Sequence, residues 1–464
     1  MDVTRREWLR AAGVAAATGA LGHSANAASP PKPNIVFILA DDLGYGDLGC
    51  YGQQRIHTPH LDRMAQEGMR FTQCYAGSTV CAPSRCALIT GLHTGHCWIR
   101  GNDRVPLRPK DATIAKLLKA EGYATGLVGK WGLGNEDTTG IPNKQGFDYF
   151  YGYLDQGHAH NYYPAFLWRN EERVPLRNVE DPKHKGVATT KVDYSHDLFA
   201  DEALKFVERN REHPFFLYLA FTIPHTNNEA GAVTRNGMEV PDYGPYANEN
   251  WPDSEKGKAA MITRMDADIG RLFAKLNELG IDDNTLVMFS SDNGSHKEGG
   301  PDPEFFKSGG PLRGYKRALY EGGIRVPGIA RWPGKIQAGA VSDQPWAFWD
   351  VMPTLCAIAG ADAPEETDGI SIAPTLFAKN GAANDQAQHE FFYWEFHEGG
   401  SKQAVRTGNW KAVRLKQGQP LELYDLASDI GETKDIAADH PDKIAKIEAY
   451  LSTALTPNEH WPLK

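Results

Sequence analysis

Four continuous, mostly apolar runs constrain the fold of this chain more than any other feature. They cover residues 34–40, 124–129, 215–221 and 285–289. Strands covered on both faces have this pattern, because parallel sheets are buried under helices on each side. We therefore predict parallel strands in a sheet that lies inside the molecule.

Helical patterns alternate with these runs, at residues 58–68, 113–121, 197–209 and 262–279. Thr58 and Pro59 supply an N-cap and a first-turn proline for the first of them. Alternating strands and helices indicate the α/β class, with helices on both faces of the sheet. We predict a large mixed, mostly parallel sheet flanked by helices.

The chain changes character after residue 376. Short strand candidates lie at 391–396, 403–406, 410–415 and 421–424, with a turn at Gly408-Asn409 and a final helix opened by Pro441. This pattern predicts a smaller antiparallel sheet packed with one helix. We expect a catalytic domain over residues 28–376 and a C-terminal α+β subdomain over 377–464.

The first 27 residues have the features of an export signal. Arg5-Arg6 form a twin-arginine pattern, an alanine-rich run follows, and Ala25-Asn26-Ala27 suits a signal peptidase. The apolar run is too short for a stable membrane span. The alternative is an amphipathic surface helix. The pattern predicts a twin-arginine translocase as partner and a periplasmic or secreted location.

Charge and cysteine content exclude some functions. The formal net charge is -10, which argues against nonspecific nucleic-acid binding. Six cysteines are present, without the paired C-x-x-C spacing of structural zinc sites. Their disulfide pairing is not readable from the sequence, and neither is the oligomeric state.

Polar residues follow each of the four apolar runs. They are Asp41, Asp42, Lys130, His225, Asp292 and Asn293. Ligands of α/β proteins bind beyond the carboxyl ends of the strands, so these side chains are expected on one rim of the sheet. The oxygen donors among them suit calcium, or alternatively magnesium, rather than zinc. A capped loop at Asp41-Asp42 and a simple turn at Asp292-Asn293 are the plainer alternatives.

One short motif adds a specific chemistry. Cys81-Ala82-Pro83-Ser84-Arg85, followed by Leu88-Ile89-Thr90-Gly91, resembles the maturation signature of the type I sulfatases. Further similar segments are Gly129-Lys130-Trp131, Pro224-His225, Ser291-Asp292-Asn293-Gly294, the Lys316 segment 314–327, residues 350–355 and residues 422–426. The resemblance therefore covers nearly all of the chain after the signal.

The resemblance implies an alkaline-phosphatase-like fold and a sulfuric ester hydrolase. In that family the cysteine is oxidised to formylglycine by a formylglycine-generating or radical maturation enzyme, and the aldehyde hydrate attacks sulfur. Residue 81 would then be metal-bound together with Asp41, Asp42, Asp292 and Asn293. The implied substrate is a sulfated small molecule or glycan, with a sulfated carbohydrate and aryl sulfates as the expected classes.

The resemblance also implies roles for individual side chains. Arg85 would hold the hydrate, and Asp292 would take a proton from it. Lys130 and Lys316 would bind sulfate oxygens, and His225 would protonate the leaving alcohol.

The sequence departs from the family pattern at one position. Many members have Lys-Trp-His-Leu-Gly, where the histidine helps to release sulfate, but this chain has Gly132 in its place. We expect His158 or His160 to supply the missing imidazole; ordinary loop histidines are the alternative.

Two other functions stay open at this point. A pocket of metal and lysines also fits a phosphomonoester or phosphonate, so a hydrolase of such esters is one alternative. A non-catalytic protein that binds sulfated glycans is the other, if Cys81 stays unmodified. The natural substrate and the position of its sulfate are not readable.

Overall fold

The computed structural model describes residues 32–381, 383 and 385–464. The predicted export signal, residues 1–27, lies outside the described residues. Lys32–Lys464 form one compact unit. No helix among the described residues combines the length and the apolar character that a membrane span needs.

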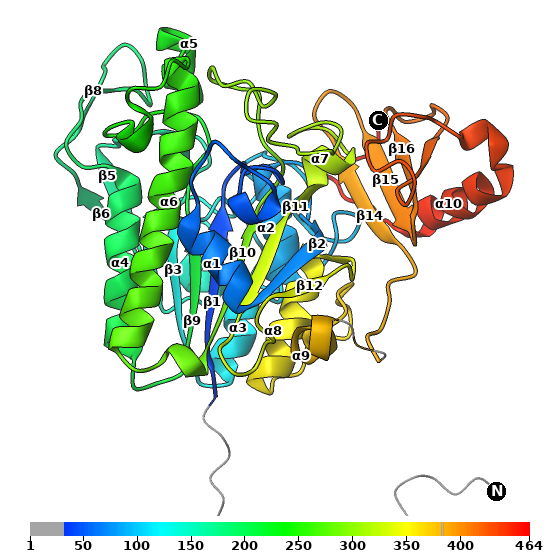
Figure 1. The fold of residues 1–464 in the computed structure, drawn as a ribbon, viewed down its shortest axis with the longest axis horizontal. Coiled ribbons are helices and arrows are strands. Elements are labelled where there is room, and N and C mark those ends of the chain that lie inside the picture. The colour runs from blue at the N-terminus through cyan, green and yellow to red at the C-terminus, as the bar shows by residue number, and fades with distance from the viewer. Residues whose placement is uncertain (1–31, 382, 384) are drawn as a thin grey trace, which may run out of the picture. The chain divides into compact units, whose positions relative to one another are not determined.

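An eleven-stranded mixed sheet forms the centre of the molecule (Figure 1). The four apolar runs are confirmed as strands β1 (Asn34–Ala40), β3 (Ala124–Lys130), β9 (Phe215–Ala220) and β10 (Thr285–Ser291). They lie side by side in the order β10-β1-β9-β3, and all pair in parallel. Their carboxyl ends therefore meet at one edge.

Further strands extend this parallel centre in both directions. On one side, beyond β10, lie β11 (Arg325–Arg331), β2 (Met69–Tyr75), β12 (Ala340–Ser342) and β13 (Trp346–Ala347); on the other lie β4 (Tyr149–Tyr153), β5 (Phe166–Arg169) and β6 (Glu172–Pro175). β11 runs antiparallel to β10, and β5 runs antiparallel to β4. The predicted mixed, mostly parallel sheet is confirmed.

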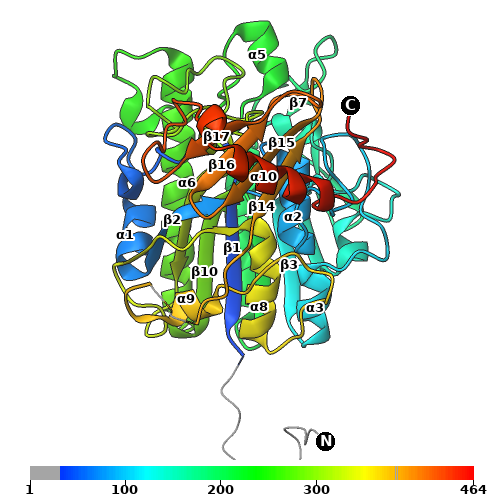
Figure 2. The ribbon, with the colours of Figure 1, turned by 90° about the vertical axis from the view of Figure 1, so that its right-hand side faces the viewer.

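Helices cover both faces of the sheet (Figures 1 and 2). Helices α1 (Pro59–Glu67), α4 (Ser195–Asn210) and α6 (Asp253–Glu278) share one hydrophobic core with the sheet, and α2 (Cys81–Thr90), α3 (Ile114–Ala120) and α8 (Val351–Ala359) share the other. Helix α6 begins at Asp253, earlier than the predicted residue 262, because Pro252 opens it and Asp253 and Glu255 occupy its first turn. Short helices are α5 (Asn228–Thr234), α7 (Glu321–Ile324) and α9 (Ala373–Phe377).

A smaller antiparallel sheet follows, as predicted. It consists of β14 (Phe392–Phe396), β15 (Lys402–Thr407), β16 (Trp410–Arg414) and β17 (Glu422–Asp425), and α10 (Pro441–Thr453) packs on it (Figure 2). Gly408, with a φ of 57°, makes the tight turn between β15 and β16. One face of this sheet packs against Tyr75 of β2 and against Trp349, which lies just before α8, and the other face packs against α10.

Candidate active site

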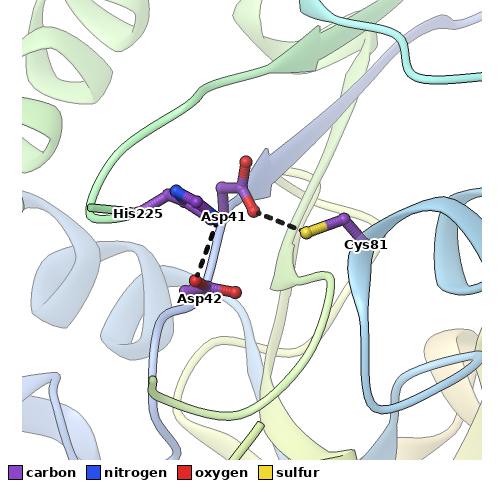
Figure 3. Close-up of side chains that lie close together, drawn as sticks. All are labelled: Asp41, Asp42, Cys81 and His225. Atoms are coloured by element: carbon purple, nitrogen blue, oxygen red, sulfur yellow. Dashed lines mark hydrogen bonds and ion pairs between the residues drawn. The ribbon is translucent and has the colours of Figure 1, made fainter. Parts of the chain in front are cut away.

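The carboxyl edge of the parallel strands gathers a cluster of buried polar side chains. Asp41 and Asp42 follow β1, Lys130 ends β3, His225 lies in the loop after β9, and Asp292 and Asn293 follow β10. Cys81 is the first residue of α2. Ligand atoms of Asp41, Asp42, Cys81 and His225 all lie within 4.8 Å of one another (Figure 3).

Two lysines neutralise the paired carboxylates. Lys130 Nζ donates to Asp41 Oδ2 at 2.7 Å, and Lys316 Nζ donates to Asp42 Oδ2 at 2.8 Å. Burial alone would raise the pKa of Asp41, but Lys130 and other cations hold it well below its ordinary value. The edge therefore carries fixed ammonium groups next to fixed carboxylates, out of contact with water.

Cys81 lies beside Asp41 and feels the charges of both lysines. The Cys81 thiol donates to Asp41 Oδ1 at 3.3 Å. Burial and the charge of Asp41 raise the pKa of Cys81 far above its ordinary value. The unmodified side chain is consequently a protonated thiol, which is a poor nucleophile.

Arg85 links α2, the helix that begins at Cys81, to Asp292 just after β10. Its Nε and Nη2 donate to Asp292 Oδ2 at 3.0 and 2.9 Å, and its Nη1 donates to the carbonyl of Lys130 at 2.8 Å. Burial, together with the nearby charge of Asp41, raises the pKa of Asp292 to about 7. Asp292 is thus close to the range in which a carboxylate accepts a proton at neutral pH.

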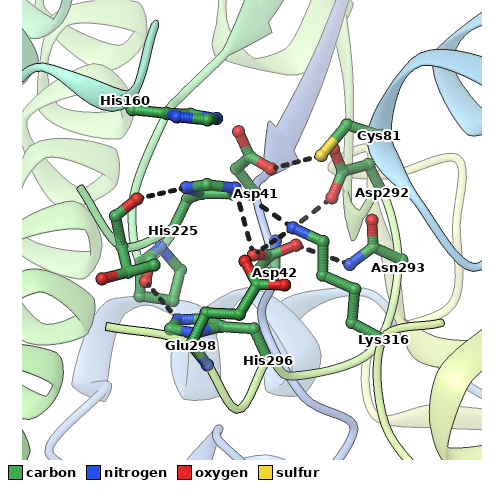
Figure 4. A network of polar contacts seen from close by, with 12 residues as sticks. Asp41, Asp42, Cys81, His160, His225, Asp292, Asn293, His296, Glu298 and Lys316 are labelled. Carbon is green, nitrogen blue, oxygen red and sulfur yellow. Dashed lines mark hydrogen bonds and ion pairs between the residues drawn. The ribbon is translucent and has the colours of Figure 1, made fainter. Parts of the chain in front are cut away.

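His225 joins the cluster from the side opposite residue 81. Its Nδ1 bonds the carbonyl of Thr226 at 2.6 Å, so its Nε2 is left to accept from Lys316 Nζ at 3.1 Å (Figure 4). Burial and the charge of Lys316 lower the pKa of His225 well below its ordinary value. The imidazole is neutral here, and an anion bound to Lys316 would favour its protonation.

The donor set fits a hard divalent cation. Asp41 and Asp42 offer carboxylate oxygens, and Asn293 Oδ1 is buried without a hydrogen-bond partner among the described residues. An unpartnered buried oxygen is the arrangement that a metal ligand leaves behind when no ion is bound. Asp292 lies outside the group within 4.8 Å, although its Oδ1 accepts from the backbone nitrogen of Asp42 at 3.1 Å.

The structure separates the two loop histidines. The ring of His160 stacks on His225, with ring centres 4.8 Å apart, and its Nδ1 lies 3.2 Å from Glu229 Oε2. His158 instead packs against Tyr153 and Phe166, with ring centres 5.0 and 4.6 Å away. His160 therefore borders the cluster, and His158 does not contact it.

Sequence reasoning missed several polar neighbours. His296 stacks near His225 at 6.0 Å, Glu229 pairs with His160, and Gln156 fills the space beside Gly132. The only signal for His296 was its place shortly after Asp292. Nothing in the sequence pointed to Gln156, because its position depends on how the loop after β4 folds over β3.

The covered parallel sheet carries carboxylates, lysines and a histidine at its carboxyl edge, and Cys81 faces them from the start of α2. With the smaller antiparallel sheet at its C-terminal end, the chain has the alkaline-phosphatase-like fold. The chain belongs to the sulfatase family, whose model matches residues 33–361. A second model, described as the C-terminal part of N-sulphoglucosamine sulphohydrolase, matches residues 314–460. The type I sulfatase resemblance is thereby confirmed.

Individual relatives agree with this assignment. Arylsulfatase A of Homo sapiens is 33% identical, over 90% of this chain and 85% of its own length. N-acetylgalactosamine-6-sulfatase of Homo sapiens is 32% identical, over 94% and 82%. The crystal structure of Ps i-CgsB in complex with k-i-k-neocarrahexaose is 30% identical with a TM-score of 0.77, and 91% of this chain and 92% of that chain are covered.

Proposed function

We propose that this enzyme hydrolyses sulfate monoesters with residue 81 as the nucleophile. The observation that carries the proposal is the position of Cys81, whose Sγ lies 3.3 Å from Asp41 Oδ1 and near the charges of Lys130 and Lys316 and the ring of His225. A tetrahedral anion at this point would meet two ammonium groups and an imidazole. Such an arrangement stabilises charge that spreads over sulfate oxygens in the transition state.

Residue 81 is proposed to act as formylglycine, made from Cys81 by a maturation enzyme. The protonated thiol is a poor nucleophile, whereas an aldehyde hydrate offers one hydroxyl for attack and a second with which to expel sulfate. Arg85 keeps α2, and so residue 81, fixed against β10 through its two bonds to Asp292. Asp292 is proposed to accept the proton of the attacking hydroxyl.

The resident metal is proposed to be calcium, with magnesium as the alternative. Asp41, Asp42, residue 81 and Asn293 Oδ1 would hold it, and Asp292 would complete the set. A bound divalent cation supplies positive charge that stabilises the anionic oxygens of the substrate. We expect chelation to abolish turnover and to lower the melting temperature, and calcium to restore both. Full activity and an unchanged melting temperature after complete chelation would contradict a metal-dependent site.

The leaving group is protonated from the Lys316–His225 pair. His225 Nε2 accepts from Lys316 Nζ at 3.1 Å, and an anionic substrate on Lys316 favours imidazolium. His225 Nδ1, fixed on Thr226, keeps Nε2 directed at the cluster. The same anion that binds thus turns His225 into the acid that the departing oxygen needs.

We propose that His160 takes over the proton transfer that a histidine at the position of Gly132 performs in many family members. It stacks on His225, and Glu229 orients its ring through Nδ1, which leaves Nε2 available. A carboxylate bonded to one ring nitrogen fixes the tautomer and the orientation of an imidazole. Release of sulfate from residue 81 needs such a base.

The substrate class and the cellular setting are further parts of this proposal. Two of the relatives are named arylsulfatase A and N-acetylgalactosamine-6-sulfatase, and the solved structure of Ps i-CgsB is a complex with k-i-k-neocarrahexaose. We propose a sulfated carbohydrate as the natural substrate, twin-arginine export to the periplasm or beyond, and a domain boundary at 376/377.

The competing function is hydrolysis of phosphate or phosphonate esters, since lysines and a metal also fit those anions. Turnover of nitrophenyl sulfate and nitrophenyl phosphate, measured on mature enzyme with calcium, tests the choice. We expect kcat/KM to favour the sulfate at least tenfold. A preference for the phosphate would overturn the proposal.

A further inference from the structure

A cavity of about 590 Å³ lies beside the catalytic cluster. Glu229 in its wall is bonded to His160, which stacks on His225. Arg104, also in the wall, lies two residues after Asn102, whose Oδ1 accepts from the backbone nitrogen of Ala82 at 3.0 Å. Two separate connections therefore bring the cavity next to residue 81 and His225.

Gln156 provides a third connection. Asp155 and Gly157, its chain neighbours, line the cavity. The Gln156 amide nitrogen lies against the point where a Cβ on Gly132 would stand, so it fills the space that a side chain at 132 would take. This nitrogen is buried and has no hydrogen-bond partner among the described residues. A ligand oxygen that reaches past Gly132 would give it one.

The cavity wall is charged but balanced in sign. Four carboxylates and three lysine or arginine side chains line it, together with the apolar side chains of Leu154, Phe166 and Trp168. Arg104 pairs with Asp155 at 3.0 Å, and Arg173 pairs with Glu136. A steroid or a flat aromatic group would strip water from these charges without replacing their hydrogen bonds. Sugar hydroxyls both donate and accept, so they match such a wall.

The balance of charge also argues against a second anionic group at this place. A pocket built for an additional sulfate would carry an excess of cations, whereas here the carboxylates outnumber them. The volume lies within the range of roughly 300–1,000 Å³ that small-molecule sites occupy.

From these observations we infer that the cavity is a saccharide subsite, which binds an uncharged sugar residue linked to the sulfated one. The inference rests on the proposed sulfate ester hydrolysis and adds the chemistry of the leaving group. The saccharide subsite makes oligosaccharide sulfates better substrates than sulfate esters that end at the sulfated group.

The test compares two kinds of substrate on the same variants. Mature wild type, Arg104→Ala and Lys185→Ala are assayed with nitrophenyl sulfate and with 6-sulfated N-acetylgalactosamine and 6-sulfated glucosamine, each free and within a disaccharide. Arg104 and Lys185 line the subsite and are exposed, so their truncation spares the core. Arg63→Ala is the matched control, because Arg63 is similarly exposed and paired but lies on α1, towards the opposite edge of the sheet.

We expect wild type to favour the better disaccharide over its free sugar at least tenfold in kcat/KM. Both subsite variants should lose at least fivefold on that disaccharide and less than twofold on nitrophenyl sulfate, while Arg63→Ala changes neither. Equal losses on all substrates, no loss on the disaccharide, or hydrolysis of nitrophenyl sulfate without any of the sugar sulfates would overturn the subsite. Failure of wild type on every sulfate ester would instead overturn the proposed function.

Discussion

His225, His160 and Glu229 form a stacked and hydrogen-bonded series at the border of the catalytic cluster. His225 faces Lys316, and Glu229 faces the saccharide subsite. The chain carries Gly132 with a φ of 80°, and the Gln156 amide fills the adjacent space. An amide cannot transfer a proton, and the imidazole of His160 is the base that we propose.

Replacement of the two loop histidines separates their roles. We expect His160→Ala to lower kcat on nitrophenyl sulfate roughly 100-fold, within the usual size of a general acid–base contribution. His158→Ala should stay within about threefold of wild type, because His158 packs on Tyr153 and Phe166 away from the cluster. Initial rates at a temperature where both variants are folded provide the measurement. Wild-type turnover in His160→Ala would remove His160 from the mechanism.

At this scale the sequence predicted which residue types gather, but not their exact partners. Asp41, Lys130, His225 and Asp292 were foreseeable because parallel strands end at one edge. The choice between His158 and His160 could not be predicted. The two residues lie close together in the sequence, but their side chains have different surroundings in the folded chain. The part that Gln156 plays depends on a space left by Gly132, which only the folded loop reveals.

Elements were predicted more reliably than the contacts between them. The buried strands and the final antiparallel sheet follow from apolar patterning alone. Thr58 is the N-cap residue of α1, as predicted, but its side chain makes no capping bond. Its hydroxyl donates to Asp62, and the backbone nitrogens of His60 and Leu61 donate to Asp266 of α6 at 3.1 and 2.7 Å. A carboxylate some 200 residues away caps this helix, and no local pattern announces it.

The small sheet is joined to the large one through a buried charge network. Lys411 Nζ of β16 donates to Glu321 Oε1 of α7 at 2.8 Å and lies 2.9 Å from Glu432 Oε1. All three side chains are fully buried. Without the Lys411 cation, the carboxylates of Glu321 and Glu432 would stay buried in a place of low dielectric constant and would lack the partner that they share.

Lys411→Met should therefore lower the free energy of unfolding by about 3–5 kcal/mol, as removal of one partner from a buried ion pair does. Urea unfolding followed by fluorescence measures the change. Lys416→Met, at an exposed position just after the same strand, is the control and should shift the value by about 0.5 kcal/mol or less. A change of similar size in both variants would contradict a stabilising network.

Across the whole molecule, buried histidines make stability depend on pH. Burial lowers the pKa of His93 to about 4, despite its neighbour Asp368, and those of His158 and His296 likewise to about 4. A base whose folded pKa is depressed contributes stability above its unfolded pKa, near 6.5. That contribution is lost as the pH falls from about 6.5 to about 4.

His93 allows this acid sensitivity to be assigned to one group. The free energy of unfolding should fall less steeply between pH 6.5 and 4 in His93→Gln than in wild type, by about 3 kcal/mol over the whole interval at most. His213→Gln, at an exposed position, should keep the wild-type slope. Equal slopes in His93→Gln and wild type would show that His93 does not titrate on unfolding.

The central claim concerns residue 81, and one measurement tests it directly. Enzyme is prepared with different amounts of maturation enzyme, and peptide mass spectrometry gives the fraction of residue 81 converted to formylglycine in each preparation. The rate of nitrophenyl sulfate hydrolysis should rise in proportion to that fraction and pass through zero for the unmodified thiol. Full activity in a preparation whose residue 81 is entirely cysteine would contradict the account.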